Sequence, residues 1–459
     1  MSAQRTYRLE SFLPWDGDYA ARHLEKMARR GWRLEKVGTI FWTYRRAEPA
    51  ALHYALTYFP AVSVFDSGPT GDQMTYADYC GAAGWKKVST YGPLQIFVNE
   101  WPDPVPIETD EGEKLTAIHG AMKKMLLLPY GALAAVWLLN LLLRLNLTSY
   151  YTVLSTLSST GALCYLLAIL LLVIYPLWMI GDYLVWYRRS RRAAERGGHC
   201  LRVHTRPRLA LQWSLVAAVL ALLLVPLAEA RVPWVPYVLA LLGGVALLLG
   251  SAALLLRLLR AHGGSRGENR AIYIVGAVVL SLVYAAAINR LIAPLLPQRE
   301  APAPAEIYTV ETEWGQRNYS IYRDDLPLTL EDLGYTVTEA DHCSYRREEQ
   351  ASPLLRWVQY EQYPCGEGTR LPDLSYDTAD VPWGWLRAWC WDRLSRYYGE
   401  GGFTETDPAP WEADLALQWE GTTGERRYLL LYGERIVFLY LGEAPTAAQR
   451  AVIVEALRG

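Results

Sequence analysis

The sequence has little of what common enzyme classes use for chemistry. Its six cysteines include no CxxC pair, so the spacing predicts neither a zinc knuckle nor a thioredoxin-like redox site. No P-loop, HExxH, GxSxG or strand-associated GxGxxG motif occurs. The histidines outside residues 199–204 stand without an evident nucleophile. We therefore expect no enzymatic activity, no cofactor and no metal site.

Charge of one sign is also scarce in parts of the chain. No lysine follows Lys124, and residues 125–300 hold 5 acidic side chains against 16 basic ones. Residues 301–459 reverse this balance, with 27 acidic and 14 basic side chains. Such segregation indicates three regions rather than one globular domain. Residues 1–30 lack an unbroken apolar core, so we expect the amino-terminal region to stay where it is made.

The apolar residues gather in five long runs, at about 125–147, 161–187, 209–228, 236–256 and 271–295. A helix needs roughly 20 apolar residues to cross a bilayer, and each run meets that length. Helices are expected because backbone groups inside the hydrocarbon must satisfy one another. The pattern predicts a cytoplasmic domain at 1–105, a linker at 106–124, five transmembrane helices within 125–297, a linker at 298–305 and an outer domain at 306–459.

The arginine clusters predict the orientation of these helices. The linker after the second run is the most basic, since only Glu195 opposes Arg188, Arg189, Arg191, Arg192, Arg196, Arg202, Arg206 and Arg208. The linker after the fourth run is basic as well, whereas the one after the first run, at 148–160, has no charge. Basic loops remain in the cytoplasm. We predict a cell-membrane protein with its amino terminus inside and, after five crossings, its carboxyl terminus outside.

The amino-terminal domain contains a repeat. In each copy a helix ends at a glycine, Gly31 or Gly84, and a tryptophan, Trp32 or Trp85, follows at once. A basic strand and an aromatic strand come next. Glycine can adopt the left-handed backbone that reverses the chain, so we assign these four residues a structural role. Two helix-Gly-Trp-strand-strand units predict an α+β head with one small sheet and helices on one face, ferredoxin-like in plan.

These repeats carry a resemblance to a known family. Residues 24–34, 41–44, 54–58 and 83–85 resemble the bacterial domain-of-unknown-function family 2812. The resemblance covers about residues 5–100. It implies a soluble cytoplasmic head attached to membrane helices, often encoded beside PadR-like transcriptional regulators. The family has no established activity, so the resemblance supplies no catalytic residues.

The acidic tail is predicted to be a second α+β domain. Strands are expected at about 307–312, 318–322, 357–363, 415–419, 427–432 and 436–441, with another from residue 335. Helices are expected from Pro382 and over 446–457. Cys343, Cys365 and Cys390 would lie in an oxidising space. A Cys343–Cys365 disulfide and three free buried thiols are both compatible with the sequence.

Two further clusters have competing interpretations. A tryptophan series, 383, 385, 389 and 391, either forms a sugar- or peptide-stacking surface through Trp383 and Trp391 or belongs largely to the core through Trp385 and Trp389. Helical spacing favours the core. His199, Cys200 and His204 are a weak metal signal, whereas the surrounding arginines suit anionic lipid headgroups. We expect membrane lipid as a partner and no nucleic acid.

The architecture as a whole predicts a non-enzymatic sensor or regulatory membrane protein. Its outer domain would bind a ligand or an envelope protein, and its head would contact a cytoplasmic regulatory protein. The five apolar runs would also suit a transporter or a transporter accessory subunit. An envelope enzyme with its site in the tail is the third interpretation.

Overall fold

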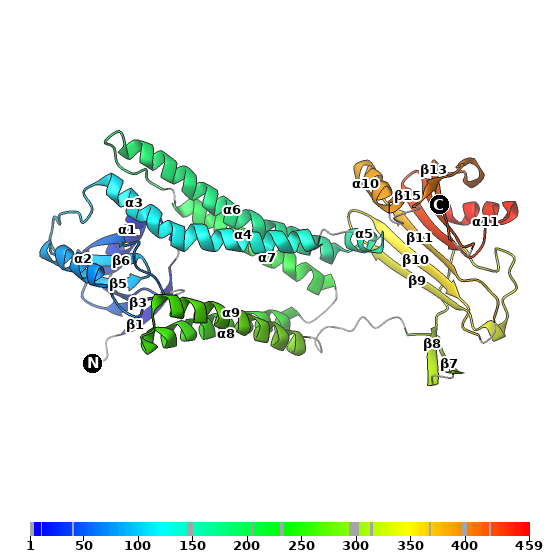
Figure 1. Cartoon of the computed structure of the whole chain (residues 1–459), viewed down its shortest axis with the longest axis horizontal. Coiled ribbons are helices and arrows are strands. Elements are labelled where there is room, and N and C mark those ends of the chain that lie inside the picture. Colours follow the sequence, from blue (N-terminus) through cyan, green and yellow to red (C-terminus); the bar gives the residue numbers. More distant parts are fainter. Residues whose placement is uncertain are drawn as a thin grey trace. The chain divides into compact units, whose positions relative to one another are not determined.

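The computed structural model (Figure 1) describes all residues except 1–3, 11, 39–40, 145–149, 204, 230–233, 293–302, 313–314, 367–368, 397–401 and 422–423. The chain divides into two compact units. Unit 1 comprises Met1–Leu141, Ala168–Leu224 and Arg231–Leu296, and unit 2 comprises Leu142–Leu167, Val225–Ala230 and Pro297–Gly459.

The head in unit 1 consists of two copies of one topology. The first copy is β1 (Arg5–Leu9), α1 (Gly17–Arg29), β2 (Trp32–Lys36) and β3 (Phe41–Arg46), and the second is β4 (His53–Tyr58), α2 (Gly71–Ala82), β5 (Lys86–Tyr91) and β6 (Leu94–Asn99). The antiparallel sheets have the orders β1-β3-β2 and β4-β6-β5. The predicted single ferredoxin-like sheet is therefore wrong, because each repeat pairs its own three strands.

The repeat extends to backbone detail. Gly31 and Gly84 end their helices with φ of +79° and +82°. In both copies the strand after the glycine carries an irregularity at the same offset, between Leu34 and Lys36 and between Lys87 and Ser89. A bulge of this kind bends and twists a strand. The backbone N–H of Val37 donates to Ser89 Oγ over 2.9 Å, which joins the two copies.

Long apolar helices follow the head. Helix α3 (Glu111–Met122) continues through a π-helical turn (Lys123–Leu127) into α4 (Leu128–Arg144), and α6 (Thr160–Ala194), α7 (Thr205–Glu229), α8 (Trp234–His262) and α9 (Arg266–Ile292) complete the set. Among the described residues four segments are long and apolar enough to cross a membrane: Glu111–Arg144, Thr160–Ala194, Thr205–Val225 and Leu242–His262. The fifth predicted span corresponds to α9, which is helical but is not among these four.

Helices α8 and α9 lie side by side as an antiparallel pair (Figure 1). Glycines make this approach close, because a Cβ on Gly244 would overlap Tyr284 and a Cβ on Gly276 would overlap Leu255. Small residues at helix contacts are typical of membrane helices, where close backbone packing drives association.

The tail in unit 2 is built on a seven-stranded antiparallel sheet of order β12-β13-β14-β15-β11-β10-β9. The strands are β9 (Ser344–Ala351), β10 (Arg356–Tyr363), β11 (Leu374–Asp380), β12 (Thr404–Glu405), β13 (Leu415–Glu420), β14 (Arg426–Tyr432) and β15 (Arg435–Leu441). A separate hairpin joins β7 (Glu306–Thr312) to β8 (Gly315–Ile321). Strands β9 and β11 were not expected, and the strand predicted from residue 335 is irregular chain.

Both faces of this sheet are buried. Helix α11 (Ala447–Leu457) supplies Ile453 and Val454 to the core on one face, which also includes Val437 and Leu439. The core on the other face contains Ile436 and Phe438. Helix α10 (Gly384–Ser395) covers that second face together with α5 (Tyr150–Leu157), the helix between α4 and α6. Alternate residues of one strand therefore serve opposite cores.

The repeat glycines give a direct test of the head. A Cβ at Gly31 would lie 2.8 Å from the carbonyl oxygen of Ala47, in a left-handed backbone. We expect Gly31→Ala to destabilise the head by roughly 1–3 kcal/mol. Gly81→Ala in helix α2, where nothing lies within 4 Å, should be neutral or stabilise the head by about 0.5–1 kcal/mol. Hydrogen exchange of head amides in the full chain measures both, and equal exchange in the two variants would contradict this explanation.

Candidate functional site

Helices α3 and α6 contribute side chains to the hydrophobic core of the head. This core joins Leu24 and Tyr44 of the head to Met122 of α3 and to Tyr183 and Trp186 of α6. Tyr183 is fully buried, and its ring centroid lies 5.4 Å from that of Trp15. Protein interiors are packed as densely as organic crystals. A displacement of α6 must therefore move side chains inside the head.

A polar contact between α3 and α6 lies at the edge of this core. His119 Nδ1 and the Tyr183 hydroxyl are 2.8 Å apart, within hydrogen-bonding distance. The imidazole ring also stacks on Tyr187 with centroids 4.1 Å apart. His119 therefore ties the helix that leaves the head to the helix that returns to it.

The arginine-rich linker between α6 and α7 is bound to the head and to α6. The indole N–H of Trp186 donates to the carbonyl of Leu201 over 2.9 Å, and the N–H of Leu201 donates to the buried Ser190 hydroxyl over 3.1 Å. The N–H of Cys200 donates to a carboxylate oxygen of Glu111 over 3.1 Å. Backbone groups of the linker thus have fixed partners on α3 and α6.

The amino-terminal cap of α1 receives the end of the same linker. One carboxylate oxygen of Asp16 accepts the N–H of Tyr19, which caps the helix. The other accepts the hydroxyl of Thr205, the first residue of α7. Both Asp16 and Thr205 are buried. One side chain therefore serves the head helix and the membrane helix at once.

Asp182 is an acidic side chain within the long apolar helix α6. It forms a two-point ion pair with Arg208 of α7, with distances of 2.6 Å and 2.9 Å. This geometry explains how both charges are accommodated beside apolar helices. The pair joins two neighbouring helices and needs no ligand.

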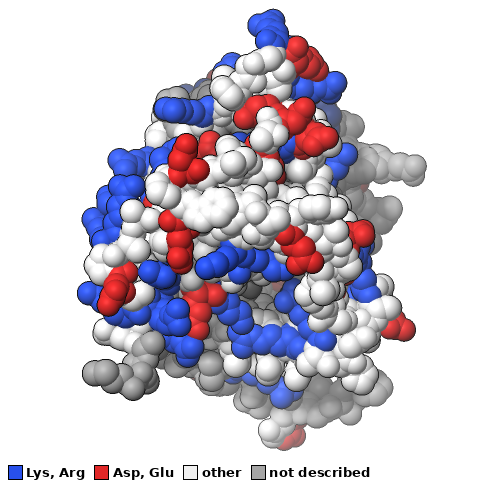
Figure 2. Space-filling model, turned by 90° about the vertical axis from the view of Figure 1, so that its left-hand side faces the viewer, with Lys and Arg blue, Asp and Glu red and all other residues white. Residues whose placement is uncertain are grey.

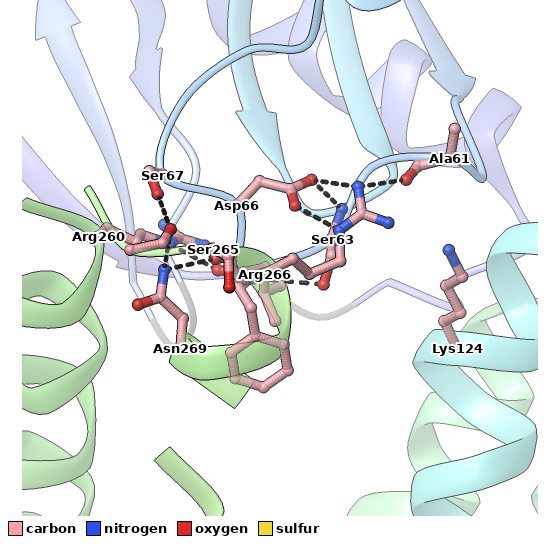
Figure 3. Close-up of polar contacts among 12 residues, drawn as sticks. Ala61, Ser63, Asp66, Ser67, Lys124, Arg260, Ser265, Arg266 and Asn269 are labelled. Atoms are coloured by element: carbon pink, nitrogen blue, oxygen red, sulfur yellow. Dashed lines mark hydrogen bonds and ion pairs between the residues drawn. The ribbon is translucent and has the colours of Figure 1, made fainter. Parts of the chain in front are cut away.

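The adjoining ends of α8 and α9 hold a head loop, residues 61–67, through several contacts (Figure 3). Arg266 donates to both carboxylate oxygens of Asp66 and, over 2.9 Å, to the carbonyl of Ala61. The guanidinium of Arg260 donates to the carbonyl of Val64, and the amide of Asn269 donates to that of Phe65 over 3.0 Å. We call this set of contacts the loop clasp. It places the second basic linker against the head.

A cavity of about 300 Å³ opens between α1, β4, residues 104–108 and the first basic linker. Charges of both signs line it, including Asp18, Arg22, Glu108, Lys114 and Arg202. Among the described residues, none of these five forms an ion pair with another. Burial raises the pKa of Glu108 to about 7, and Lys114 opposes that rise. Glu108 therefore titrates close to neutral pH.

The predicted site residues fall into three places. Gly31, Trp32, Gly84 and Trp85 lie in the head repeats, where Trp85 is buried and its indole N–H donates to the carbonyl of Val105 over 2.8 Å. Cys343 and Cys365 are buried free thiols, and burial raises the pKa of Cys343 to about 11. A disulfide between them stays a prediction for oxidising conditions.

The tryptophan series differs from its expected arrangement. Trp383 and Trp385 are 49% and 68% exposed, whereas Trp389 and Trp391 pack against the core beneath α10. The exposed pair is thus Trp383 with Trp385, and not Trp383 with Trp391. The reason is that the buried stripe of α10 is Leu386, Cys390 and Leu394, so Trp389 and Trp391 on either side of Cys390 pack at its edges.

Metal binding by the first linker has no support among the described residues, where no three His, Cys, Asp or Glu side chains form a cluster able to hold a metal. His204 lies outside the described residues. His199 and Cys200 instead contact Glu111. Sequence reasoning missed Glu111, Asp16 and the loop clasp, because their partners lie far away along the chain.

The comparison with known families identifies the head. Residues 18–129 match the family described as Protein of unknown function (DUF2812). The resemblance noted in the sequence is therefore confirmed. The DUF2812 match runs past the head through α3 into the first residues of α4, so the family unit includes the helix that packs into the head's core. No curated protein and no solved structure matches the chain significantly.

The contact between Cys200 and Glu111 can be tested through the reactivity of the Cys200 thiol. Burial, followed by the hydrogen bond to Glu111, raises the pKa of Cys200 to about 12, which keeps the thiol unreactive. We expect Glu111→Gln to accelerate alkylation of Cys200 several-fold, because the linker loses a charged acceptor and the thiol ionises more easily. Peptide mapping by mass spectrometry quantifies the labelling. Glu113→Gln, on the same helix turn but exposed, is the control, and equal rates in the two variants would rule out this role for Glu111.

The raised pKa of Glu108 predicts that the stability of the fold depends on pH. A carboxyl group whose pKa is about 7 in the folded protein and 4.5 unfolded binds more protons in the folded state between those values. Stability should therefore fall as pH rises from about 4.5 to about 7. Glu108→Gln should flatten this part of the Tm–pH profile, whereas substitution of the exposed Glu100 by Gln should leave it unchanged. A slope identical to wild type in the Glu108 variant would show that another group titrates.

Proposed function

We propose that the protein is a non-enzymatic membrane sensor or regulatory protein that links an outer binding domain to a cytoplasmic head. One observation carries this proposal: a single stretch of chain, from α3 to α6, contributes side chains to a hydrophobic core of the head and to another of the tail. Its inner parts supply Met122, Tyr183 and Trp186 to the core of the head. Its middle helix, α5, supplies Leu154 to a core of the tail.

The contacts of α5 with the tail are specific as well as apolar. The hydroxyl of Ser352 donates to the carbonyl of Leu157 over 2.5 Å, and that of Ser158 donates to Gln350 over 3.2 Å. The ring of Tyr151 meets Trp357 edge-on, with centroids 5.2 Å apart. A ligand that repacks the tail would therefore shift α5. Packed elements move as rigid bodies or change between discrete arrangements, so α4 and α6 would transmit that shift.

The contacts of α5 with the tail also support our proposal that head and tail are on opposite sides of the membrane. Helix α5 lies between two candidate membrane spans, so it is expected on the far side from the inner ends of α4 and α6. The tail packs on α5, whereas both basic linkers contact the head. An odd number of crossings is needed to connect the two sides. We propose α9 as the fifth crossing and a cytoplasmic amino terminus.

Helix α2 of the head exposes side chains that suit contact with a cytoplasmic protein partner. Met74 and Tyr79 are 56% and 73% exposed. Exposed aromatic and methionine side chains are enriched at protein interfaces. Acidic and basic side chains are interspersed over much of the head end, and basic ones are frequent along its left and lower edges (Figure 2). We propose membrane lipid and a cytoplasmic regulatory protein as the partners on this side.

Transmission between the two ends can be tested within the molecule. Leu154→Ala removes the buried contact of α5 with the tail, which costs roughly 2–5 kcal/mol of local packing. If the α3–α6 stretch couples the two ends, this change should alter the alkylation rate of Cys200 in the full chain by at least twofold. The readout lies in the linker at the head, so it reports a change at a distance.

Leu457→Ala provides the matched control. Leu457 is equally buried, but it belongs to the core on the opposite face of the tail sheet, which contains no residue of α5. This variant should leave the Cys200 rate at the wild-type value. If both variants alkylate at the wild-type rate, the proposed coupling fails. If both change the rate equally, tail stability rather than α5 governs the effect, and the coupling role assigned to α5 fails.

A further inference from the structure

A short exposed stretch of the tail, residues 382–385, carries two uncovered indole rings. Trp383 and Trp385 lie on either side of Gly384 at the start of α10, and all four residues are exposed. Exposing one large aromatic side chain is ordinary, but two exposed tryptophans within three residues favour a partner, and we call this stretch the patch. Trp389 and Trp391 of the same helix pack against the core and are not part of this patch.

Two hydrogen bonds and a short stretch of chain connect the patch to the start of α6. The indole N–H of Trp383 donates to the carbonyl of Pro353 over 3.1 Å. The neighbouring Ser352 donates to the carbonyl of Leu157. Leu157 ends α5 only a few residues before Thr160, where the candidate span of α6 begins. Helix α10 also contacts α5 directly. The exposed indoles therefore belong to a part of the tail that is hydrogen-bonded to the segment leading into α6.

We propose that Trp383 and Trp385 anchor the tail domain in the headgroup region of the membrane leaflet on its own side. Tryptophan is enriched at this level because its ring is amphipathic, with an apolar body and a polar N–H. Trp383 uses its N–H within the tail, whereas that of Trp385 has no hydrogen-bond partner among the residues described. Lipid carbonyl and phosphate oxygens are acceptors for it.

This anchoring would hold the tail domain at a fixed position relative to the membrane surface. The domain is held in two ways: through α5, and through the two indoles in contact with the phospholipid surface. The proposal depends on α4 and α6 crossing the membrane. It does not depend on the sensor role, because anchoring and transmission have different readouts.

The test places a fluorophore between the two indoles. Gly384→Cys keeps both tryptophans, and a Cβ there meets only Arg387 at 3.9 Å. The full chain carries Cys164→Ser and Cys200→Ser so that partly exposed thiols do not react. It is labelled with the fluorophore NBD in nanodiscs of phosphatidylcholine and phosphatidylglycerol. Lipids with a doxyl quencher near the headgroup should quench position 384 strongly.

A matched label reports the rest of the tail. Ala448→Cys lies exposed on α11, which packs on the opposite face of the sheet from α5 and α10 (Figure 1). It should show at least fivefold less quenching. Adding Trp383→Ala and Trp385→Ala to the Gly384→Cys chain should reduce quenching at 384 at least twofold.

Two results would overturn the proposal. Equal quenching at positions 384 and 448, whether high or absent in both, would show that the patch has no special relation to the lipid. Quenching at 384 that survives loss of both indoles would place the stretch near the membrane without the indoles as anchors. The first result would leave a soluble sugar or peptide as the alternative occupant of the patch.

Discussion

The burial of membrane-helix side chains inside a soluble domain is the constraint on which unit 1 depends. Tyr183 and Trp186 belong to α6, yet they complete a core that begins with head residues such as Leu24 and Tyr44. In a bilayer the apolar face of a helix gains little by leaving lipid for protein, since both are apolar. Where α6 packs against the head instead of lipid, burial of the same side chains away from water is fully favourable. The head therefore packs on the part of α6 whose apolar side chains would otherwise be exposed to water.

That arrangement leaves polar groups of the linker between α6 and α7 that must find partners, and side chains of the head, α3 and α6 supply them. Glu111 accepts the N–H of Cys200, and Asp16 accepts the hydroxyl of Thr205 at a helix cap. Buried polar groups are costly unless they are hydrogen-bonded. The linker between α6 and α7 and the first residue of α7 are thereby held against α3 and the amino-terminal cap of α1. The coupling argued for the α3–α6 stretch rests on these bonds as much as on the apolar core.

The sequence predicted the parts of the structure that depend on neighbours along the chain. The left-handed glycines Gly31 and Gly84 and the long apolar helices follow from local composition, and the resemblance of the head to DUF2812 was confirmed over residues 18–129. It did not predict that each head repeat forms its own sheet, because strand pairing depends on contacts between distant residues. The edge strand β9, with its run of arginines and glutamates, lacks the alternation that marks a half-buried strand. Glu111 and Asp66 carry no motif, and only the fold reveals their partners.

The fold also gives a reason for arginine at three positions after Lys124. Arg208 meets both oxygens of Asp182, Arg266 meets both oxygens of Asp66 and the Ala61 carbonyl, and Arg260 donates two N–H groups to the Val64 carbonyl. Each contact uses the planar, forked donors of a guanidinium. A lysine would offer one compact ammonium group and could not hold two fixed directions at once. At these positions arginine therefore joins α6 to α7 and joins α8 and α9 to the head.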